Sequence, residues 1–79
     1  MDARKKPVKL QVNNSGAWKD VVRFDAADEH AAGEVMGAAE TLGRIDGGKT
    51  TFRIVMENSL STSLYRWSSQ NGWQEVRHA

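Results

Sequence analysis

The residues with the most recognisable spacing are Gly43, Gly48, Lys49 and Thr50, which match the phosphate-loop pattern G-x-x-x-x-G-K-[ST]. In nucleotide-binding proteins that loop follows a strand and opens a helix, whose first amides hold the phosphates. The order expected here is the reverse, because a helix is predicted to end at Leu42 and a strand to begin near Thr50. We therefore interpret the segment as a glycine-rich turn between a helix and a strand, and predict no cofactor.

The remaining polar residues do not favour metal binding or catalysis. His30 and Glu34 are four residues apart on the predicted helix and would supply half of a metal site, but the only other histidine is His78. The chain has no cysteine, which excludes thiol nucleophiles and cysteine-ligated metals. The serines between positions 59 and 69 have no base nearby in an expected element, and no second acid completes a carboxylate pair. The prediction is a non-enzymatic protein without a metal.

Charge is distributed unevenly along the 79 residues, although the net charge is only +1. Residues 1–23 carry six basic and two acidic groups (+4), residues 24–48 carry one basic and six acidic groups (−5), and residues 49–79 carry four basic and two acidic groups (+2). An acidic segment between two basic ones can steer a charged partner, or it can simply be a solvated surface.

An N-terminal hairpin is the first predicted element. Val8, Leu10 and Val12 alternate with polar residues, as in a half-buried strand, and Gly16 can close a tight turn. The return strand, 17–24, would pair Val12 with Trp18 and Val8 with Val22. That register places Asp20 on the apolar side, so a bulge or a strand end is expected there.

A helix over residues 26–42 follows, with Asp25 as its N-cap and Gly43 as its C-cap. Its apolar residues recur every three or four positions, which predicts one buried stripe. The stripe consists of Ala27, Ala31, Val35, Ala38 and Leu42, with Ala32, Met36 and Ala39 at its flank.

The C-terminal part reads as three further strands. Residues 52–56 alternate in polarity, and Asn71-Gly72 is a strong signal for a two-residue hairpin turn. A turn centred there pairs Trp67 with Val76 and Arg66 with Arg77, and it leaves Trp73 on the arginine side of the sheet.

Together these elements predict an α+β fold of order ββαβββ, in which one helix packs on one face of a mainly antiparallel sheet. Residues 1–7 are predicted to be a basic N-terminal tail and residues 8–79 a single domain. No apolar run approaches the roughly 20 residues of a membrane span, so we expect a cytoplasmic protein.

Two surfaces of this fold are candidates for binding a partner. The acidic helix face, opposite the apolar stripe, has an open glycine strip that another backbone can approach, and each glycine costs the helix about 1 kcal/mol relative to alanine. Its residues are Glu29, Gly33, Glu34, Gly37 and Glu40. The predicted basic face, on the open side of the sheet, combines arginines with a tryptophan, as nucleic-acid platforms do. Its residues are Arg23, Arg53, Arg66, Trp73 and Arg77.

The chain resembles the small proteins encoded by bacteriophages and prophages, among them the anti-CRISPR inhibitors. The resemblance is carried by segments 12–18 (VNNSGAW), 22–29 (VRFDAADE) and 65–73, which contains Tyr65-Arg66-Trp67 and Gly72-Trp73. It is a likeness of size and style over the whole chain, and it transfers no site residue. What it implies is a non-enzymatic protein that binds a bacterial CRISPR–Cas complex and blocks access of DNA.

The function predicted first is that of an inhibitor, and nucleic-acid binding is the alternative. An inhibitor would use the acidic helix face to mimic the charge of DNA against a basic groove of its protein partner. A nucleic-acid-binding module would instead use the predicted basic face. The oligomeric state, monomer or weak homodimer, stays open, and so does any role of the 58–63 connection.

Overall fold

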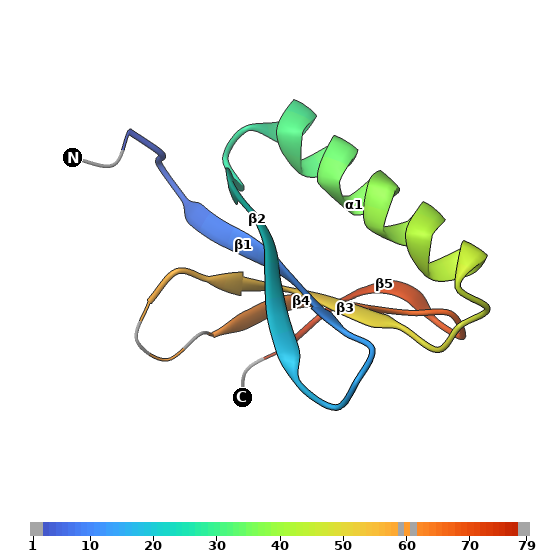
Figure 1. Cartoon of the computed structure of the whole chain (residues 1–79). Coiled ribbons are helices and arrows are strands. Elements are labelled where there is room, and N and C mark those ends of the chain that lie inside the picture. Colours follow the sequence, from blue (N-terminus) through green and yellow to red (C-terminus); the bar gives the residue numbers. More distant parts are fainter. Residues whose placement is uncertain (1–2, 59, 61, 78–79) are drawn as a thin grey trace.

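One helix lies across one face of a five-stranded antiparallel sheet in the computed structural model, which describes residues 3–58, 60 and 62–77 (Figure 1). The elements are β1 (Pro7–Asn13), β2 (Trp18–Asp25), α1 (Glu29–Ile45), β3 (Thr51–Met56), β4 (Ser63–Ser68) and β5 (Gly72–Glu75). The strand order is β2-β1-β3-β4-β5, and all neighbours are antiparallel. The predicted α+β class and the order ββαβββ are confirmed. His78 and the serines at 59 and 61 lie outside the described residues.

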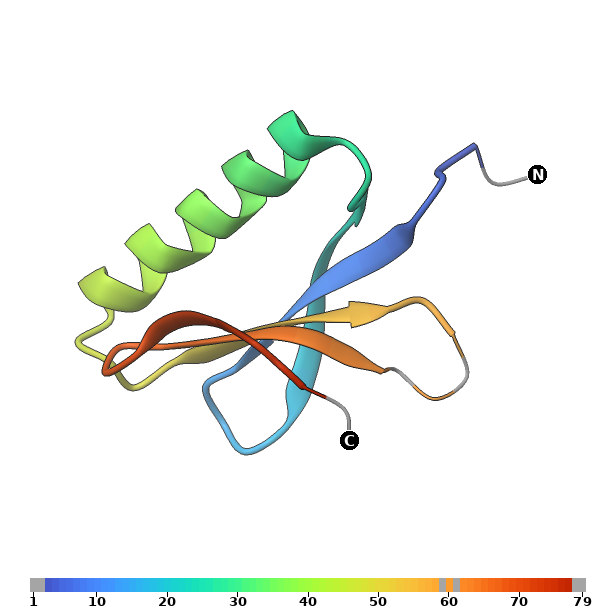
Figure 2. The same cartoon turned by 180° about the vertical axis from the view of Figure 1, so that it is seen from behind.

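The hydrophobic core lies between α1 and the sheet. The view from behind shows α1 lying over one face of the sheet (Figure 2). Alternate residues of the central strands supply the core, because successive side chains of a strand point to opposite faces. Those nearest the helix are almost fully buried: Val8, Leu10, Phe52, Ile54 and Trp67. The rings of Phe52 and Trp67 pack edge-on, with 6.0 Å between their centres.

The N-terminal hairpin forms, but in a different register from the predicted one. Val8 pairs with Phe24, and Val12 pairs with Lys19. Leu10 pairs with Val22 and Gln11 with Asp20, so Val21 is an extra residue in β2. The bulge was expected at Asp20 and occurs at the next residue. Because one inserted residue exchanges the two faces of a strand, Trp18 lies on the side away from the helix.

The helix begins three residues later than predicted, and Asp28 is its N-cap. The Asp28 carboxylate accepts the backbone N–H of Ala31 at 3.1 Å. Asp25, the predicted cap, instead accepts backbone N–H groups from Lys5 at 3.1 Å, Lys6 at 3.0 Å and Ala27 at 2.9 Å. The C-terminal end of the predicted basic tail is thus tied to the start of the helical segment, and β1 already includes Pro7.

Asp25 gives the fold a specific pH dependence. Hydrogen bonds from the backbone of Ala27 and Lys6 lower the pKa of Asp25 below its ordinary value of 3.8. A carboxylate whose pKa is lowered on folding stabilises the protein above its unfolded pKa, and this contribution is lost as the pH falls through the folded pKa. We expect urea denaturation to show Asp25→Asn less stable than the wild type at pH 7, with the difference shrinking below about pH 4. The exposed Glu75→Gln is the control, and a difference for Asp25→Asn that is constant with pH would contradict this role.

The helix is rotated relative to the predicted stripe. Ala39 is fully buried, whereas Leu42, which was expected in the core, is 58 % exposed. The residues that face the sheet are Ala32, Val35, Met36, Ala39 and Gly43. Gly43 explains the rotation, because a Cβ atom at this position would lie 2.2 Å from a ring carbon of Trp67. Gly43 is therefore a packing residue, and the C-cap is Asp46.

The C-terminal hairpin also departs from the predicted register. Ser68 pairs with Gly72 and Trp67 with Trp73, so the loop contains three residues, 69–71. Gly72 has a φ of +68°, and the backbone N–H of Asn71 donates to Ser68 Oγ. The predicted pairs of Trp67 with Val76 and of Arg66 with Arg77 are wrong, and Trp73 lies on the helix side of the sheet. Among the described residues, no helix is long and apolar enough to cross a membrane.

Candidate nucleic-acid interface

The face of the sheet opposite α1 gathers cations from four strands. Gln11 of β1 pairs with Arg53 of β3, and Arg53 pairs with Arg66 of β4. Lys9 and Arg23 form the neighbouring pair between β1 and β2. We call this surface the open sheet face and define it by Lys9, Gln11, Trp18, Asp20, Arg23, Arg53 and Arg66. Three of the five residues of the predicted basic face therefore lie on it.

Trp18 supplies the aromatic ring of this surface. The guanidinium carbon of Arg53 lies 4.2 Å from the centre of the Trp18 ring, which is a cation–π contact. Arg53 Nε also donates to Gln11 Oε1 at 2.7 Å, and Gln11 is only 7 % exposed. The Arg53 side chain is thus held by a ring on one side and a buried amide on the other. Such a fixed arginine loses little entropy when it binds a ligand.

Arg53 and Arg66 form a like-charge pair directly across two strands. In the part of the chain that the structure describes, no carboxylate lies within ion-pair distance of either guanidinium. Partial burial, and after it the charge of Arg66, lowers the pKa of Arg53 below its ordinary value. Like charges placed opposite each other destabilise a sheet. An anion bound between them would relieve this repulsion.

The remaining cations of the face have counter-ions. Asp20 accepts hydrogen bonds from Gln11 Nε2 at 2.8 Å and from Lys9 Nζ at 3.2 Å, and these lower its pKa. Arg23 Nε contacts Glu57 at 2.6 Å, and Glu57 also meets Arg4. With Arg4 and Glu57 included, the surface carries five cations and two carboxylates, a charge of +3 that is least compensated at Arg53 and Arg66.

Two residues of the predicted basic face are not part of it. Trp73 packs against the core, and its Nε1 donates to the backbone oxygen of Met36 in α1 at 3.0 Å. The three-residue loop causes this, because it shifts the register and so turns Trp73 to the other face. Arg77 lies beyond the end of β5 and has no pairing partner in the sheet. The sequence feature that could have placed Trp18 correctly is Asp20. A carboxylate on the predicted apolar side indicates a bulge in this strand, and a bulge there moves Trp18 to the opposite face of the sheet.

The acidic helix face is exposed, but its charge is partly compensated. Glu34 contacts His30 Nε2 at 2.6 Å, and Glu40 lies 3.9 Å from Arg44. Nothing lies within 4 Å of a Cβ atom built on Gly33 or Gly37, so the glycine strip is open as predicted. Glu29 lies in the first helical turn, where a negative charge stabilises the helix dipole.

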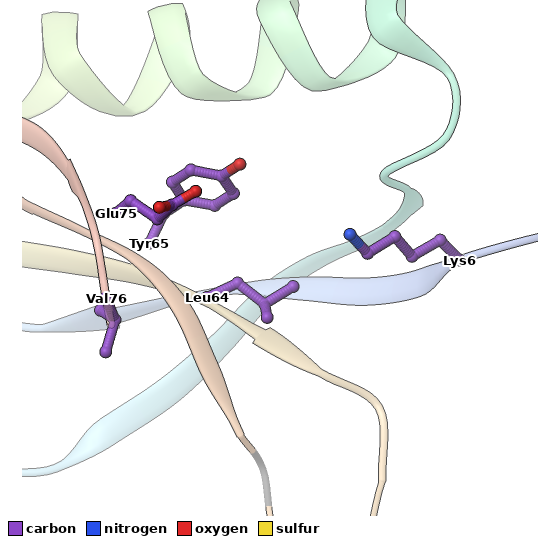
Figure 3. A pocket seen from close by; sticks show the side chains of 5 residues that line it. All are labelled: Lys6, Leu64, Tyr65, Glu75 and Val76. Carbon is purple, nitrogen blue, oxygen red and sulfur yellow. The ribbon is translucent and has the colours of Figure 1, made fainter. Parts of the chain in front are cut away.

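A small hollow with charged groups at its rim lies beside β4 and β5, and it has a volume of about 140 Å³ (Figure 3). Its lining consists of Lys6, Leu64, Tyr65, Glu75 and Val76. The amino group of Lys6 and the carboxylate of Glu75 lie on opposite sides of it. None of these residues belongs to the open sheet face or to the acidic helix face. Among residues 3–58, 60 and 62–77, no three His, Cys, Asp or Glu side chains are grouped to hold a metal ion.

Comparisons with protein families, curated proteins and solved structures found no match. The open sheet face is therefore interpreted from its own geometry and charge.

Proposed function

We propose that this protein is a non-enzymatic module that binds single-stranded nucleic acid through the open sheet face. The observation that carries the proposal is the uncompensated Arg53–Arg66 pair beside the Trp18 ring. A cationic surface with an adjacent aromatic ring suits a single strand, because phosphates meet the cations while a base stacks on the ring. Arg53 uses its Nε for Gln11, and no other hydrogen bond from its side chain is present among the described residues. Its terminal amino groups are thus available to a phosphate.

Fluorescence anisotropy with a labelled oligothymidine of about 12 nucleotides tests this function. If Arg53 and Arg66 each neutralise one phosphate, affinity should fall about sevenfold between about 50 and about 200 mM salt. A duplex of the same length should bind more weakly, because its bases cannot reach Trp18. Failure to bind at the lower salt, or an affinity independent of salt, would contradict the proposal.

A second candidate is an inhibitor of phage or prophage origin, of the anti-CRISPR type, which acts in the bacterial cytoplasm. What supports it is the open Gly33–Gly37 strip beside Glu29 and Glu34, where the backbone of a protein partner can approach closely. The face would then mimic the charge of DNA against a basic CRISPR–Cas groove and block access of DNA. It ranks second because Glu34 and Glu40 already have partners within the helix, the imidazole of His30 and the guanidinium of Arg44.

An affinity pull-down from a bacterial lysate, with and without nuclease, separates the two functions. The inhibitor predicts one defined protein complex whose recovery is unaffected by nuclease, and loss of that complex when the acidic residues are changed to lysine. The residues to change are Glu29, Glu34 and Glu40. The nucleic-acid module predicts that co-purifying material disappears on nuclease treatment and is insensitive to these changes. Calorimetry that finds partner binding unchanged in the lysine variant would rule out the acidic helix face as the contact surface.

A further inference from the structure

A row of four polar side chains crosses four of the five strands on the open sheet face. Gln11 pairs with both Asp20 of β2 and Arg53 of β3, and Arg53 pairs with Arg66 of β4. Paired residues of neighbouring strands lie on the same face, about 4.8 Å apart. The row thus has a carboxylate at one end and two guanidinium groups at the other, with an amide beside the carboxylate.

An acidic residue in such a row would ordinarily weaken the binding of an anion. Two strand spacings, about 10 Å, separate Asp20 from Arg53, and this is about the Debye length at 0.1 M salt. The direct repulsion between Asp20 and a phosphate bound at Arg53 therefore changes the affinity by at most about twofold. A larger effect of Asp20 has to be carried by the side chain between them.

Gln11 provides this link, because its amide is hydrogen-bonded to both neighbours. Gln11 Nε2 donates to Asp20 Oδ1 at 2.8 Å, and Gln11 Oε1 accepts from Arg53 Nε at 2.7 Å. An ionised carboxylate can only accept hydrogen bonds, and a guanidinium can only donate them. Each neighbour thus requires a different end of the amide. Because Gln11 is buried, water cannot readily replace either partner.

The carboxylate of Asp20 determines how this amide is oriented. If the amide were turned by 180°, its NH₂ group would face Arg53 Nε and its oxygen would face the carboxylate, so both hydrogen bonds would be lost. Lys9 Nζ donates to the other oxygen of Asp20 at 3.2 Å and so helps to hold the carboxylate in place. Hydrogen bonds from Gln11 and Lys9 lower the pKa of Asp20, which keeps it ionised at neutral pH. An alanine at position 20 would remove this constraint on the amide and on Arg53.

We propose that Asp20 is a positioning residue for anion binding, because through the Gln11 amide it keeps the Arg53 guanidinium on the Trp18 ring. An arginine that is already ordered loses less entropy when it binds a phosphate. Asp20 thereby raises the affinity of the open sheet face for an anion, the opposite of the effect that its charge predicts. This role rests on the proposed binding of single-stranded nucleic acid.

Two substitutions that delete the same charge test the role of Asp20. Asp20→Asn keeps an oxygen that can accept from Gln11, whereas Asp20→Ala does not. In fluorescence anisotropy with the labelled oligothymidine at low salt, Asp20→Ala should bind about fivefold more weakly than the wild type, because Arg53 must then be ordered on binding. Asp20→Asn should bind at least as tightly as the wild type. Charge alone predicts that both variants bind slightly more tightly.

The order of Arg53 can be measured by NMR without nucleic acid. In the free wild type the Arg53 Nε–H signal should lie apart from those of solvated arginines, since this group donates to Gln11 and its guanidinium lies on the Trp18 ring. The signal should move to the solvated position in Asp20→Ala. It should do the same in Gln11→Met, which keeps the charge of Asp20, and stay in place in Asp20→Asn. An unchanged Trp73 indole signal shows that each variant is folded.

The outcomes separate this inference from the proposed function. Equal affinities of Asp20→Ala and Asp20→Asn, or an Arg53 signal that is unchanged in Asp20→Ala, would overturn the positioning role of Asp20. Failure of the wild type to bind the oligothymidine would instead overturn the proposed function. The Arg53 signal would still decide whether Asp20 positions this side chain, because it is measured in the free protein.

Discussion

Gly43→Ala is expected to lower the free energy of unfolding by about 3 kcal/mol. The added Cβ atom would lie 2.2 and 2.4 Å from two ring carbons of Trp67, and Trp67 is 2 % exposed. The buried ring of Trp67 cannot move away from the added Cβ atom without displacing Phe52 or the helix itself. The higher helix propensity of alanine offsets only about 1 kcal/mol of this loss in the free energy of unfolding. Urea denaturation followed by tryptophan fluorescence measures the difference.

Gly37→Ala is the matched control, because it makes the same chemical change in the same helix. Nothing lies within 4 Å of its added Cβ atom. It should therefore stabilise the protein by about 0.5–1 kcal/mol through helix propensity and the reduced entropy of the unfolded chain. Opposite signs for the two variants are the expected pattern. A neutral Gly43→Ala would show that α1 does not rest on Trp67 as the structure has it.

The double variant Arg53→Gln, Arg66→Gln is expected to weaken binding of the oligothymidine about tenfold at low salt and to remove most of its salt dependence. Both changes delete a positive charge from the centre of the open sheet face. Removing the cross-strand repulsion stabilises the sheet, whereas losing the contacts of Arg53 with Trp18 and Gln11 destabilises it, so we expect the free energy of unfolding to change by less than about 1 kcal/mol. Urea denaturation of the double variant shows whether it stays folded, so that a loss of affinity is not attributed to unfolding.

Arg77→Gln serves as the control for this pair, since it deletes the same charge beyond the end of β5. We expect its affinity for the oligothymidine to stay within about twofold of the wild type. Equal losses in the control and in the double variant would show that only the net charge matters and that the open sheet face is no site.

The types of the elements could be predicted from the sequence because each is a local property. Alternation around Val8 and Leu10, the three- and four-residue spacing from Ala31 to Leu42, and the turn residues near Gly16 each depend on a few neighbours. The face that each element packs against the core depends on residues that are distant in the sequence. The rotation of α1 depends on Gly43 meeting Trp67, which is 24 positions away along the chain.

The candidate site shows the same limit. Arg53 and Arg66 were placed correctly, because the alternation of β3 fixes the face of Arg53 and that of β4 fixes the face of Arg66. The tryptophan was assigned wrongly, since one bulge at Val21 moves Trp18 onto the open sheet face and one extra loop residue removes Trp73 from it. In a strand an error of a single residue exchanges the two faces completely. The type of surface was thus predictable, but the tryptophan on it was not.

The most direct measurement is a titration of ¹⁵N-labelled protein with the oligothymidine, followed through the indole and guanidinium N–H signals. Our account predicts that signals of Trp18, Arg53 and Arg66 shift together, whereas the Trp73 indole, bonded to Met36 under the helix, stays in place. Shifts confined to α1, or a Trp18 signal unchanged at saturation, would contradict binding of nucleic acid on the open sheet face.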